Sequence, residues 1–460
     1  MKEERTKFLH LDLKGISPAV PRFREYLAYF ASLGFQGIVL ECDCRIPWKC
    51  WEGAGEILYT REEIALLAEY AESLNMEVIP LIQVQGHMEW VLKEEKYAFL
   101  REDGFFNDLC PSRPESAEKL FAWIDDVSEL FPRAKRIHLG GDEAWHLGKC
   151  PLCREKIASD PLRRGKLGLF ADHVSSLARY AKEKKGLQVL LWDDMFCRAD
   201  EELLNPLLDL FPSDTVFVHW NYSLKEEEEP LPAGLGNRTV WGASALRCGF
   251  ANHFVHVLNP VGERIRNIRN WEKASCPVLH TTWGRPNNLW NPYGPWEALI
   301  PEFYAAGRGT KMWEQHPWHS FAFLLDEAMK HGEYKKLEHA LALARELPFS
   351  DKWEEQSRNF FLLGIQYELL RLEAKSHLEV MRARSVLGKY GRMDPAGCEK
   401  EYAAGREKFR EKISAWEKDL ETFWKENCLS DFEEYRDLRK AEFFPDLLFG
   451  EKGERRHENC

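Results

Sequence analysis

The chain has 460 residues, of which 44% are hydrophobic and 13% aromatic, and its net charge is −12. This length and composition provide for a large core and about two domains, whereas the acidic balance argues against nucleic acid or an anionic membrane surface as a partner. The sequence has no run of about 18 apolar residues that could span a membrane, and no apolar stretch typical of a signal peptide near its start. We therefore expect a soluble, cytoplasmic protein.

Eight short apolar runs recur along the chain, with helical patterns between several of them. The runs occupy residues 7–15, 37–42, 77–84, 136–143, 187–194, 215–222, 239–246 and 277–284. Several are continuously apolar, as expected of parallel strands that are covered on both faces. One intervening helix begins with a capping box of Thr60 and Glu63, and others are predicted over residues 114–131 and 167–183. This order of elements predicts an α/β fold, a (β/α)8 barrel over residues 1–310.

The pattern changes after residue 310 to long amphipathic helices. Leu362, Ile365, Leu369 and Leu372 form one apolar stripe at helical spacing, and dense charge lies between them. Ile413, Trp416, Leu420 and Phe423 form a second stripe of the same kind. Such stripes must be covered by another helix or by the barrel. We expect an α-helical C-terminal domain over residues 311–460, which could also join two copies of the chain in a homodimer.

Cysteine spacing gives one signal typical of metal sites. Cys150 and Cys153 in "GKCPLCRE" have CxxC spacing, and the chain has 12 cysteines in all. A structural zinc site also needs a second CxxC or a suitably spaced pair of histidines, and the sequence shows neither clearly. We therefore expect free thiols, with no metal ion and no cofactor.

Polar and aromatic residues gather at the C-terminal ends of the predicted strands. They are Asp12, Glu41, Asp43, His87, Asp142, Glu143, Trp192, Asp193, Asp194, Trp220 and Trp283. In a (β/α)8 barrel these ends converge on one face, where active sites are built. Each residue alone could be structural, but together they predict a site on that face.

The stretch "RIHLGGDEAW" places two acids, Asp142 and Glu143, side by side after a buried strand. Glycosidases that use two protein carboxylates need one on each side of the anomeric carbon, about 5 Å apart for retention and about 6.5–9.5 Å apart for inversion. Neighbours on one strand cannot straddle a sugar ring in this way. They fit a reaction in which a 2-acetamido group of the substrate is the nucleophile, one acid orients that group, and the other protonates the leaving oxygen. The like charge alongside helps to keep the pKa of the acid near neutrality.

Several segments resemble family 20 glycoside hydrolases, the β-N-acetylhexosaminidases, and in particular the hexosaminidase D branch. "HLGGDE" is similar to the signature of that family, and "PLIQVQGHMEW", "LLWDDMF", "HWNY" and "TTWGR" are similar to its other strand ends. The resemblance implies an exo-acting, retaining enzyme that releases terminal GlcNAc or GalNAc from an amino-sugar-containing glycan through an oxazolinium intermediate. It also implies that Asp142 orients the acetamido group, that Glu143 is the general acid/base, and that His87 supports them.

The resemblance assigns the remaining site residues to substrate binding. Trp192, Trp220 and Trp283 would wall the subsite of the cleaved sugar, and Asp193 and Glu41 lie beside them at strand ends. Tyr222 is the candidate that contacts the acetamido oxygen.

The sequence departs from the family pattern at two strand ends. Better-known members have an arginine at the first strand end, where this chain offers Asp12 or Lys14, and an acid after the last tryptophan, where it has Arg285. These departures leave the preference between GlcNAc and GalNAc open.

Two other functions are compatible with the same residues. In a metal-dependent barrel hydrolase, His87, His138, Asp142 and Glu143 would be ligands of a hard metal ion. A non-catalytic glycan-binding protein would keep the cleft without turnover. Since both acids are present, the sequence favours the enzyme.

Overall fold

The structure is a computed structural model that describes residues 6–197, 199, 201–248, 258–285, 291–391 and 394–441. The chain divides into two compact units. The first comprises residues 1–254, 264–293 and 301–314, and the second comprises residues 255–263, 294–300 and 315–460.

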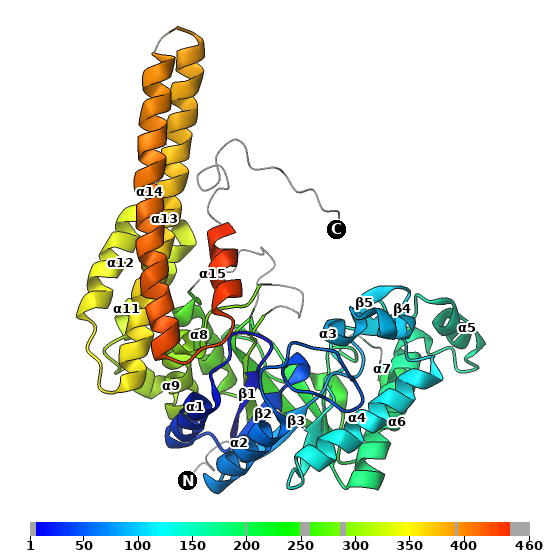
Figure 1. Cartoon of the computed structure of the whole chain (residues 1–460). Coiled ribbons are helices and arrows are strands. Elements are labelled where there is room, and N and C mark those ends of the chain that lie inside the picture. Colours follow the sequence, from blue (N-terminus) through cyan, green and yellow to red (C-terminus); the bar gives the residue numbers. More distant parts are fainter. Residues whose placement is uncertain are drawn as a thin grey trace. The chain divides into compact units, whose positions relative to one another are not determined.

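The first unit is a closed barrel of eight parallel strands, in the order β1-β10-β9-β8-β7-β6-β3-β2 (Figure 1). The strands are β1 (Lys7–Asp12), β2 (Gly37–Glu41), β3 (Glu77–Leu81), β6 (Arg136–His138), β7 (Gln188–Trp192), β8 (Val216–Trp220), β9 (Thr239–Arg247) and β10 (Val278–Thr282). The predicted barrel and each of its eight predicted strands are confirmed. Their buried, continuously apolar sequences follow from helices that cover the outer face.

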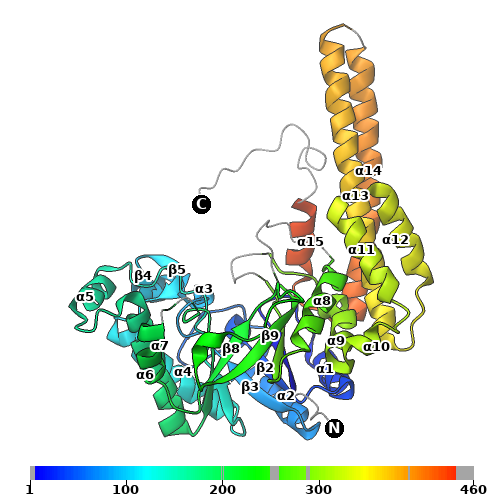
Figure 2. The same ribbon diagram turned by 180° about the vertical axis from the view of Figure 1, so that it is seen from behind.

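Helices α1 (Val20–Leu33), α2 (Arg61–Ser73), α4 (Pro114–Leu130), α6 (Gly165–Lys185) and α7 (Glu201–Leu208) follow successive strands. Figure 2 shows α6 and α7 on the outside of the ring of strands. Helix α2 begins with the predicted capping box, in which Thr60 accepts the N–H of Glu63 and Glu63 accepts the N–H of Thr60. Later elements are η3 (Ala233–Leu235), α8 (Val261–Trp271), η4 (Trp296–Leu299), α9 (Ile300–Arg308) and α10 (Thr310–Trp313).

Three connections on the C-terminal side of the barrel carry additional elements that the sequence analysis does not predict. The connection after β2 contains η1 (Asp43–Arg45), and the one after β3 contains α3 (Glu89–Leu92), η2 (Glu95–Leu100) and an antiparallel hairpin of β4 (Arg101–Glu102) and β5 (Phe105–Leu109). The connection after β6 contains α5 (Pro151–Ser159).

The interior of the barrel is filled by apolar side chains from all parts of the ring. They are Phe8, Val39, Ile79, Leu81, Leu190, Trp192, Val216, Val218, Trp241, Ala243 and Leu279. Trp220 and Trp283 are only partly buried and pack against this cluster. The barrel is therefore a packed core rather than a pore, as is usual for this fold, and any ligand must bind at the strand ends.

The second unit is helical, as predicted for the C-terminal part of the chain. Its helices are α11 (His319–His331), α12 (Tyr334–Glu346), α13 (Lys352–Lys389), α14 (Pro395–Glu426) and α15 (Phe432–Ala441). Helices α13 and α14 lie side by side over much of their length (Figure 1). Trp416 packs on Tyr367, with ring centroids 5.1 Å apart, and the Trp416 indole donates to the carbonyl of Leu363. No helix among the described residues is long and apolar enough to cross a membrane.

The two apolar stripes predicted for these helices differ in burial. Ile413, Trp416, Leu420 and Phe423 on α14 are all buried. On α13 only Ile365 of the predicted stripe is buried, whereas Leu362, Leu369 and Leu372 are half-buried. The neighbouring side chains Leu363 and Tyr367 are also buried. The buried face of α13 is therefore rotated from the one that the apolar spacing predicts.

Candidate active site

The acid pair follows β6 on a sharply bent segment of chain. Gly140 and Gly141 both have positive φ, 58° and 84°, and a Cβ at Gly140 would collide with the Gln83 side chain. Glu143 also has a positive φ of 51°, a conformation that costs energy for a residue with a side chain. Asp142 is almost fully buried, whereas the Glu143 side chain is 37% exposed. The bend thus directs one carboxylate inward and the other toward solvent.

His87 joins the two acids. Its Nε2 lies 3.3 Å from Asp142 Oδ2 and 3.4 Å from Glu143 Oε2, and its Nδ1 lies 3.9 Å from Glu89 Oε1. Burial alone would lower the pKa of His87, but the surrounding carboxylates outweigh burial and raise it well above its usual value. The surrounding carboxylates thus favour the protonated form of His87, which faces both acids. The preceding Gly86 leaves no space for a Cβ, which would collide with the carbonyl of Asp142.

Asp194 is a third carboxylate in this group. It accepts the backbone N–H of Glu143 at 3.1 Å and the indole N–H of Trp220 at 3.4 Å. Burial and the nearby Asp142 raise its pKa to about 7. The sequence analysis places Asp194 at a strand end but assigns the binding role to its neighbour Asp193. In the structure Asp193 is buried and paired with His219 at 2.9 Å, so Asp194, and not Asp193, lies with the acid pair.

Three aromatic side chains form a wall beside the acids. The Trp283 indole donates to the hydroxyl of Tyr222 at 2.9 Å, and the Tyr222 ring lies 5.2 Å from that of Trp220. All three residues are partly buried. Trp192, which the sequence analysis also places in this wall, is fully buried in the barrel core, 6.1 Å from the Trp283 ring. Strand β7 directs the Trp192 side chain into the barrel. Trp192 therefore packs beneath Trp283 as part of the core.

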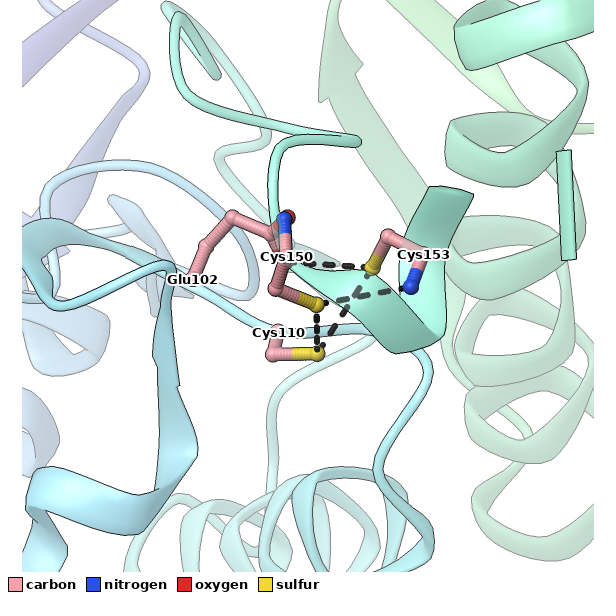
Figure 3. Close-up of side chains that lie close together, drawn as sticks. All are labelled: Glu102, Cys110, Cys150 and Cys153. Atoms are coloured by element: carbon pink, nitrogen blue, oxygen red, sulfur yellow. Dashed lines mark hydrogen bonds between the residues drawn. The ribbon is translucent and has the colours of Figure 1, made fainter. Parts of the chain in front are cut away.

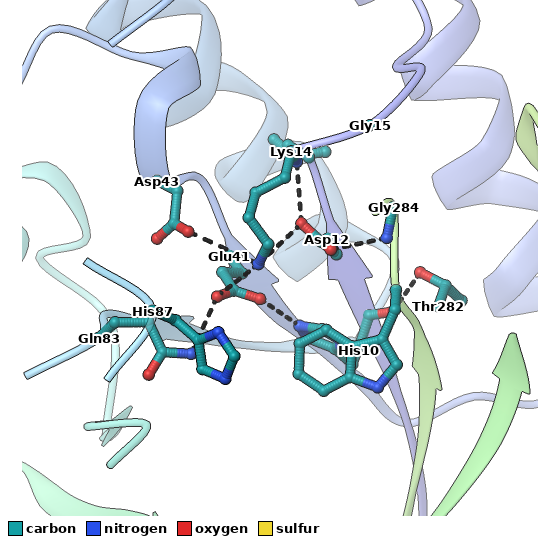
Figure 4. A network of polar contacts seen from close by, with 12 residues as sticks. His10, Asp12, Lys14, Gly15, Glu41, Asp43, Gln83, His87, Thr282 and Gly284 are labelled. Carbon is teal, nitrogen blue, oxygen red and sulfur yellow. Dashed lines mark hydrogen bonds and ion pairs between the residues drawn. The ribbon is translucent and has the colours of Figure 1, made fainter. Parts of the chain in front are cut away.

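A buried polar network occupies the ends of β1 and β2 (Figure 4). The Lys14 ammonium lies 2.8 Å from Glu41, 3.2 Å from Asp12 and 3.5 Å from Asp43. Glu41 also pairs with His10 at 2.9 Å, and Asp12 accepts the N–H of Gly284 at 2.6 Å. Burial disfavours the charge on Lys14, but the three carboxylates outweigh it and raise the pKa of Lys14.

The same network explains the two residues that the sequence analysis assigns to substrate at this end of the barrel. Asp12 and Glu41 are fully buried, and each carboxylate oxygen of both residues has a polar partner. These contacts hold Lys14 and the β10 end in place. A direct contact of Asp12 or Glu41 with the sugar stays a prediction.

Asp43 and Glu89 are two buried carboxylates at this face. The Lys14 ammonium lies 3.5 Å from Asp43, and His87 lies 3.9 Å from Glu89. Among the described residues nothing donates a hydrogen bond to either oxygen of Asp43 or of Glu89, although both side chains are buried. Burial and repulsion from Glu41 raise the pKa of Asp43 well above its usual value. Buried acceptors are normally satisfied, so both are candidates for ligand contacts. The sequence analysis notes Asp43 but assigns it no role. It does not identify Glu89, because this residue lies in α3 and not at the end of a strand.

The structure does not gather the four residues of the metal-dependent alternative into a coordination site. Nδ1 of His138 accepts the N–H of Gly140 at 2.9 Å, and the ring packs on Trp192. Among the described residues, two groups bring candidate ligand atoms within 4.8 Å of one another, and neither contains His87, His138, Asp142 or Glu143.

Known proteins are similar to a large part of this chain. The family model for "Glycosyl hydrolase family 20, catalytic domain" matches residues 23–244. Bovine hexosaminidase D is 33% identical over 288 residues, which cover 59% of this chain and 80% of the bovine one. Human hexosaminidase D is 33% identical over 283 residues, which cover 58% of this chain and only 55% of the human one.

Solved structures share the fold. A structure of the pneumococcal virulence factor StrH has a TM-score of 0.51 and 15% identity. The match covers 80% of this chain and 99% of that chain. The β-N-acetylhexosaminidase from Bacteroides fragilis has a TM-score of 0.50 and 19% identity. The match covers 66% of this chain and 65% of that chain. At these identities the likeness shows the fold alone.

Proposed function

The chain belongs to glycosyl hydrolase family 20, and from this premise we propose that it is an exo-acting β-N-acetylhexosaminidase with substrate-assisted, retaining catalysis. Its substrate would be a glycan that ends in β-linked GlcNAc or GalNAc. The names of its relatives, hexosaminidase D and β-hexosaminidase, support the class of substrate.

One observation supports the mechanism: Asp142 and Glu143 share a single imidazole nitrogen, at 3.3 Å and 3.4 Å. Because Asp142 and Glu143 are consecutive residues after one strand, we expect both to reach a bound sugar from the same side. A protein nucleophile would have to face the acid across the anomeric carbon, about 5 Å away. The geometry therefore favours a nucleophile that comes from the substrate, namely the oxygen of its 2-acetamido group.

The two acids then have different tasks. Asp142 accepts the acetamido N–H, so that the acetamido oxygen is aimed at C1, and its charge stabilises the oxazolinium ion that forms. Glu143 gives its proton to the glycosidic oxygen as the bond between that oxygen and C1 breaks. In the second step Glu143 takes a proton from a water molecule. The oxygen of that water attacks C1, and the bond between C1 and the acetamido oxygen breaks, which opens the oxazolinium ring. His87 donates to both carboxylates and holds them in position.

The aromatic wall would receive the acetamido group. The indole N–H of Trp283 is a donor only, so the Tyr222 hydroxyl is the acceptor in their contact. The Tyr222 hydroxyl would donate to the acetamido oxygen, while the faces of Trp220 and Trp283 pack on the methyl group and the sugar ring. Asp43, with its unsatisfied oxygens, would accept sugar hydroxyls.

A panel of four nitrophenyl glycosides tests the proposal: β-GlcNAc, β-GalNAc, β-Glc and β-Gal. We expect hydrolysis of one or both acetamido sugars and none of the 2-hydroxy sugars, because no protein group replaces the missing nucleophile. A thiazoline mimic of the oxazolinium should inhibit far more tightly than the free sugar, and Asp142→Asn should weaken both turnover and that inhibition. Efficient β-glucosidase activity, or a covalent glycosyl-enzyme trapped on an Asp or Glu by a 2-fluoro sugar, would contradict the mechanism.

A further inference from the structure

Away from the acid pair, three cysteines and a glutamate converge in the interior of the first unit (Figure 3). Cys110 Sγ lies 3.5 Å from Cys150 Sγ and 3.6 Å from Cys153 Sγ, and Cys153 Sγ lies 3.1 Å from Glu102 Oε2. All four side chains are buried. We propose that Glu102, Cys110, Cys150 and Cys153 bind a structural Zn²⁺ ion, a site that the glycosidase chemistry itself does not use.

The spacing of the ligand atoms suits tetrahedral zinc. With Zn–S bonds of about 2.3 Å, two sulfurs on a tetrahedral ion lie about 3.8 Å apart. The two short S···S distances of 3.5 Å and 3.6 Å need only a small expansion to reach this value. The four candidate ligand atoms all lie within 4.8 Å of one another, so one ion could contact all of them.

The carboxylate distinguishes a cation site from a cluster of packed thiols. Glu102 is fully buried, and among the described residues no Lys, Arg or His side chain pairs with it. Its contacts are the N–H of Cys150 at 2.7 Å and the thiol of Cys153. An unpaired buried carboxylate is costly. A disulfide would use two of the three sulfurs and leave Glu102 without a cation, whereas Zn²⁺ would engage all four groups.

Further donors around the cluster would stabilise the negative charge of three thiolates and a carboxylate. Cys150 is the N-cap of α5, and the N–H of Cys153 donates to Cys150 Sγ at 3.4 Å. The hydroxyl of Ser112 lies 3.0 Å from Cys153 Sγ. A helix N-terminus and hydrogen bonds to sulfur are the usual second set of contacts around a thiolate-bound metal.

The ion would join the two segments that carry the proposed catalytic groups. Glu102 is the last residue of β4 and Cys110 directly follows β5, in the hairpin that comes after His87. Cys150 ends the loop that begins at Glu143, and Cys153 lies in the first turn of α5. Direct contacts already connect these segments, since Asp108 on β5 accepts the N–H of His146. The effect of zinc on activity rests on the proposed function, whereas zinc binding does not.

Zinc content and variants of the full chain test the site. We expect about one zinc per chain in reduced protein purified from zinc-supplemented cells, measured by elemental analysis. Cys110→Ser and Cys153→Ser should lose it, whereas Cys276→Ser, at a buried cysteine outside the cluster, should keep it. Ser112→Ala should weaken zinc binding roughly tenfold, as loss of a contact to a ligand does. Zinc retained in a Cys110→Ser, Cys153→Ser double variant would overturn the proposal.

A cobalt experiment on the unaltered chain covers the case in which the serine variants fail to fold. Co²⁺ that replaces zinc should give tetrahedral d–d bands and a thiolate charge-transfer band whose intensity corresponds to three sulfur ligands. Binding should weaken at low pH, because the metal must displace thiol protons. Failure of reduced protein to bind either metal, or a disulfide between any two of the three cysteines in the chain as purified, would overturn the site.

Activity gives a separate readout. We expect removal of zinc to lower the thermal midpoint and to reduce hydrolysis of the acetamido glycosides at least tenfold, with recovery when zinc is restored. If zinc binds as expected and no acetamido sugar is cleaved, the metal site stands and the proposed glycosidase function fails. If the sugars are cleaved by a chain that binds no metal, the reverse holds.

Discussion

Two groups of carboxylates lie at the same end of the barrel and differ in how their charge is balanced. Around Lys14, the carboxylates of Asp12 and Glu41 are fully buried and fully paired. Around His87, Asp142 and Glu143 share one imidazole, and the Glu143 side chain is 37% exposed. Burial alone would raise the pKa of Glu41, but Lys14 and His10 lower it overall, whereas burial and Asp142 raise that of Asp194 to about 7.

This difference indicates a structural role for the carboxylates around Lys14 and a catalytic role for those around His87. A carboxylate held ionised by a buried cation cannot exchange protons near neutral pH, but it can fix two strand ends relative to each other. The acids near His87 include Asp194, whose pKa is raised to about 7, and a group that titrates near neutrality is suited to acid–base catalysis. We therefore expect substitutions around Lys14 to change stability first, and substitutions around His87 to change turnover first.

The largest effect is expected for Glu143→Gln. The amide keeps the shape of the side chain but cannot give a proton to the leaving oxygen, and general acid catalysis contributes on the order of 10²–10⁴-fold. Substrates with poor leaving groups should lose most and activated aryl glycosides least, measured as kcat/KM for both. An equal loss on both classes would show that Glu143 is not the acid.

Lys14→Met should have the largest effect on stability. The substitution keeps the apolar stem and removes the ammonium, which leaves Asp12 and Glu41 buried without it, and breaking a buried ion pair in this way costs about 3–5 kcal/mol. Urea unfolding near pH 7 measures the free energy of unfolding. Asp142→Asn is the matched comparison and should cost less than about 1 kcal/mol. Equal losses in the two variants would contradict the division between the two groups.

Asp194→Asn should change how stability depends on pH. In the folded chain the pKa of Asp194 is about 7, above its usual value. Its contribution to stability is therefore fully present below about pH 4, the usual pKa of aspartate, and is lost as pH rises through about 7. The asparagine variant lacks this titration, so the difference in unfolding free energy between the two proteins should shift in favour of the variant from pH 5 to pH 8. A constant difference would place the titration on another group.

The smallest effect is expected for Tyr222→Phe. The variant removes the acceptor of the Trp283 N–H and the proposed donor to the acetamido oxygen. Loss of one hydrogen bond of this kind is worth about 1 kcal/mol, so kcat/KM for an acetamido glycoside should fall roughly fivefold with little change in unfolding. Trp192→Phe, a change in the supporting core, should instead lower stability more than turnover.

The sequence alone identified the features that depend on neighbours in the chain. Apolar runs and their spacing indicated the barrel and the helical C-terminal part, and Thr60 with Glu63 indicated the start of a helix. The adjacency of Asp142 and Glu143 carried the mechanistic hypothesis, because two neighbouring acids cannot face each other across a sugar. These are local properties, fixed by backbone periodicity and by covalent connection.

The tertiary structure decided which side chains meet. Successive residues at a strand end point in different directions, so the choice between Asp193 and Asp194 depended on which of them faces Asp142. The cysteine cluster shows the same dependence over a longer distance. The CxxC of Cys150 and Cys153 looked incomplete in the sequence because Glu102 and Cys110 lie 40 or more residues earlier. The β4–β5 hairpin and the loop before α5 bring these residues together. No local sequence pattern predicts that they meet.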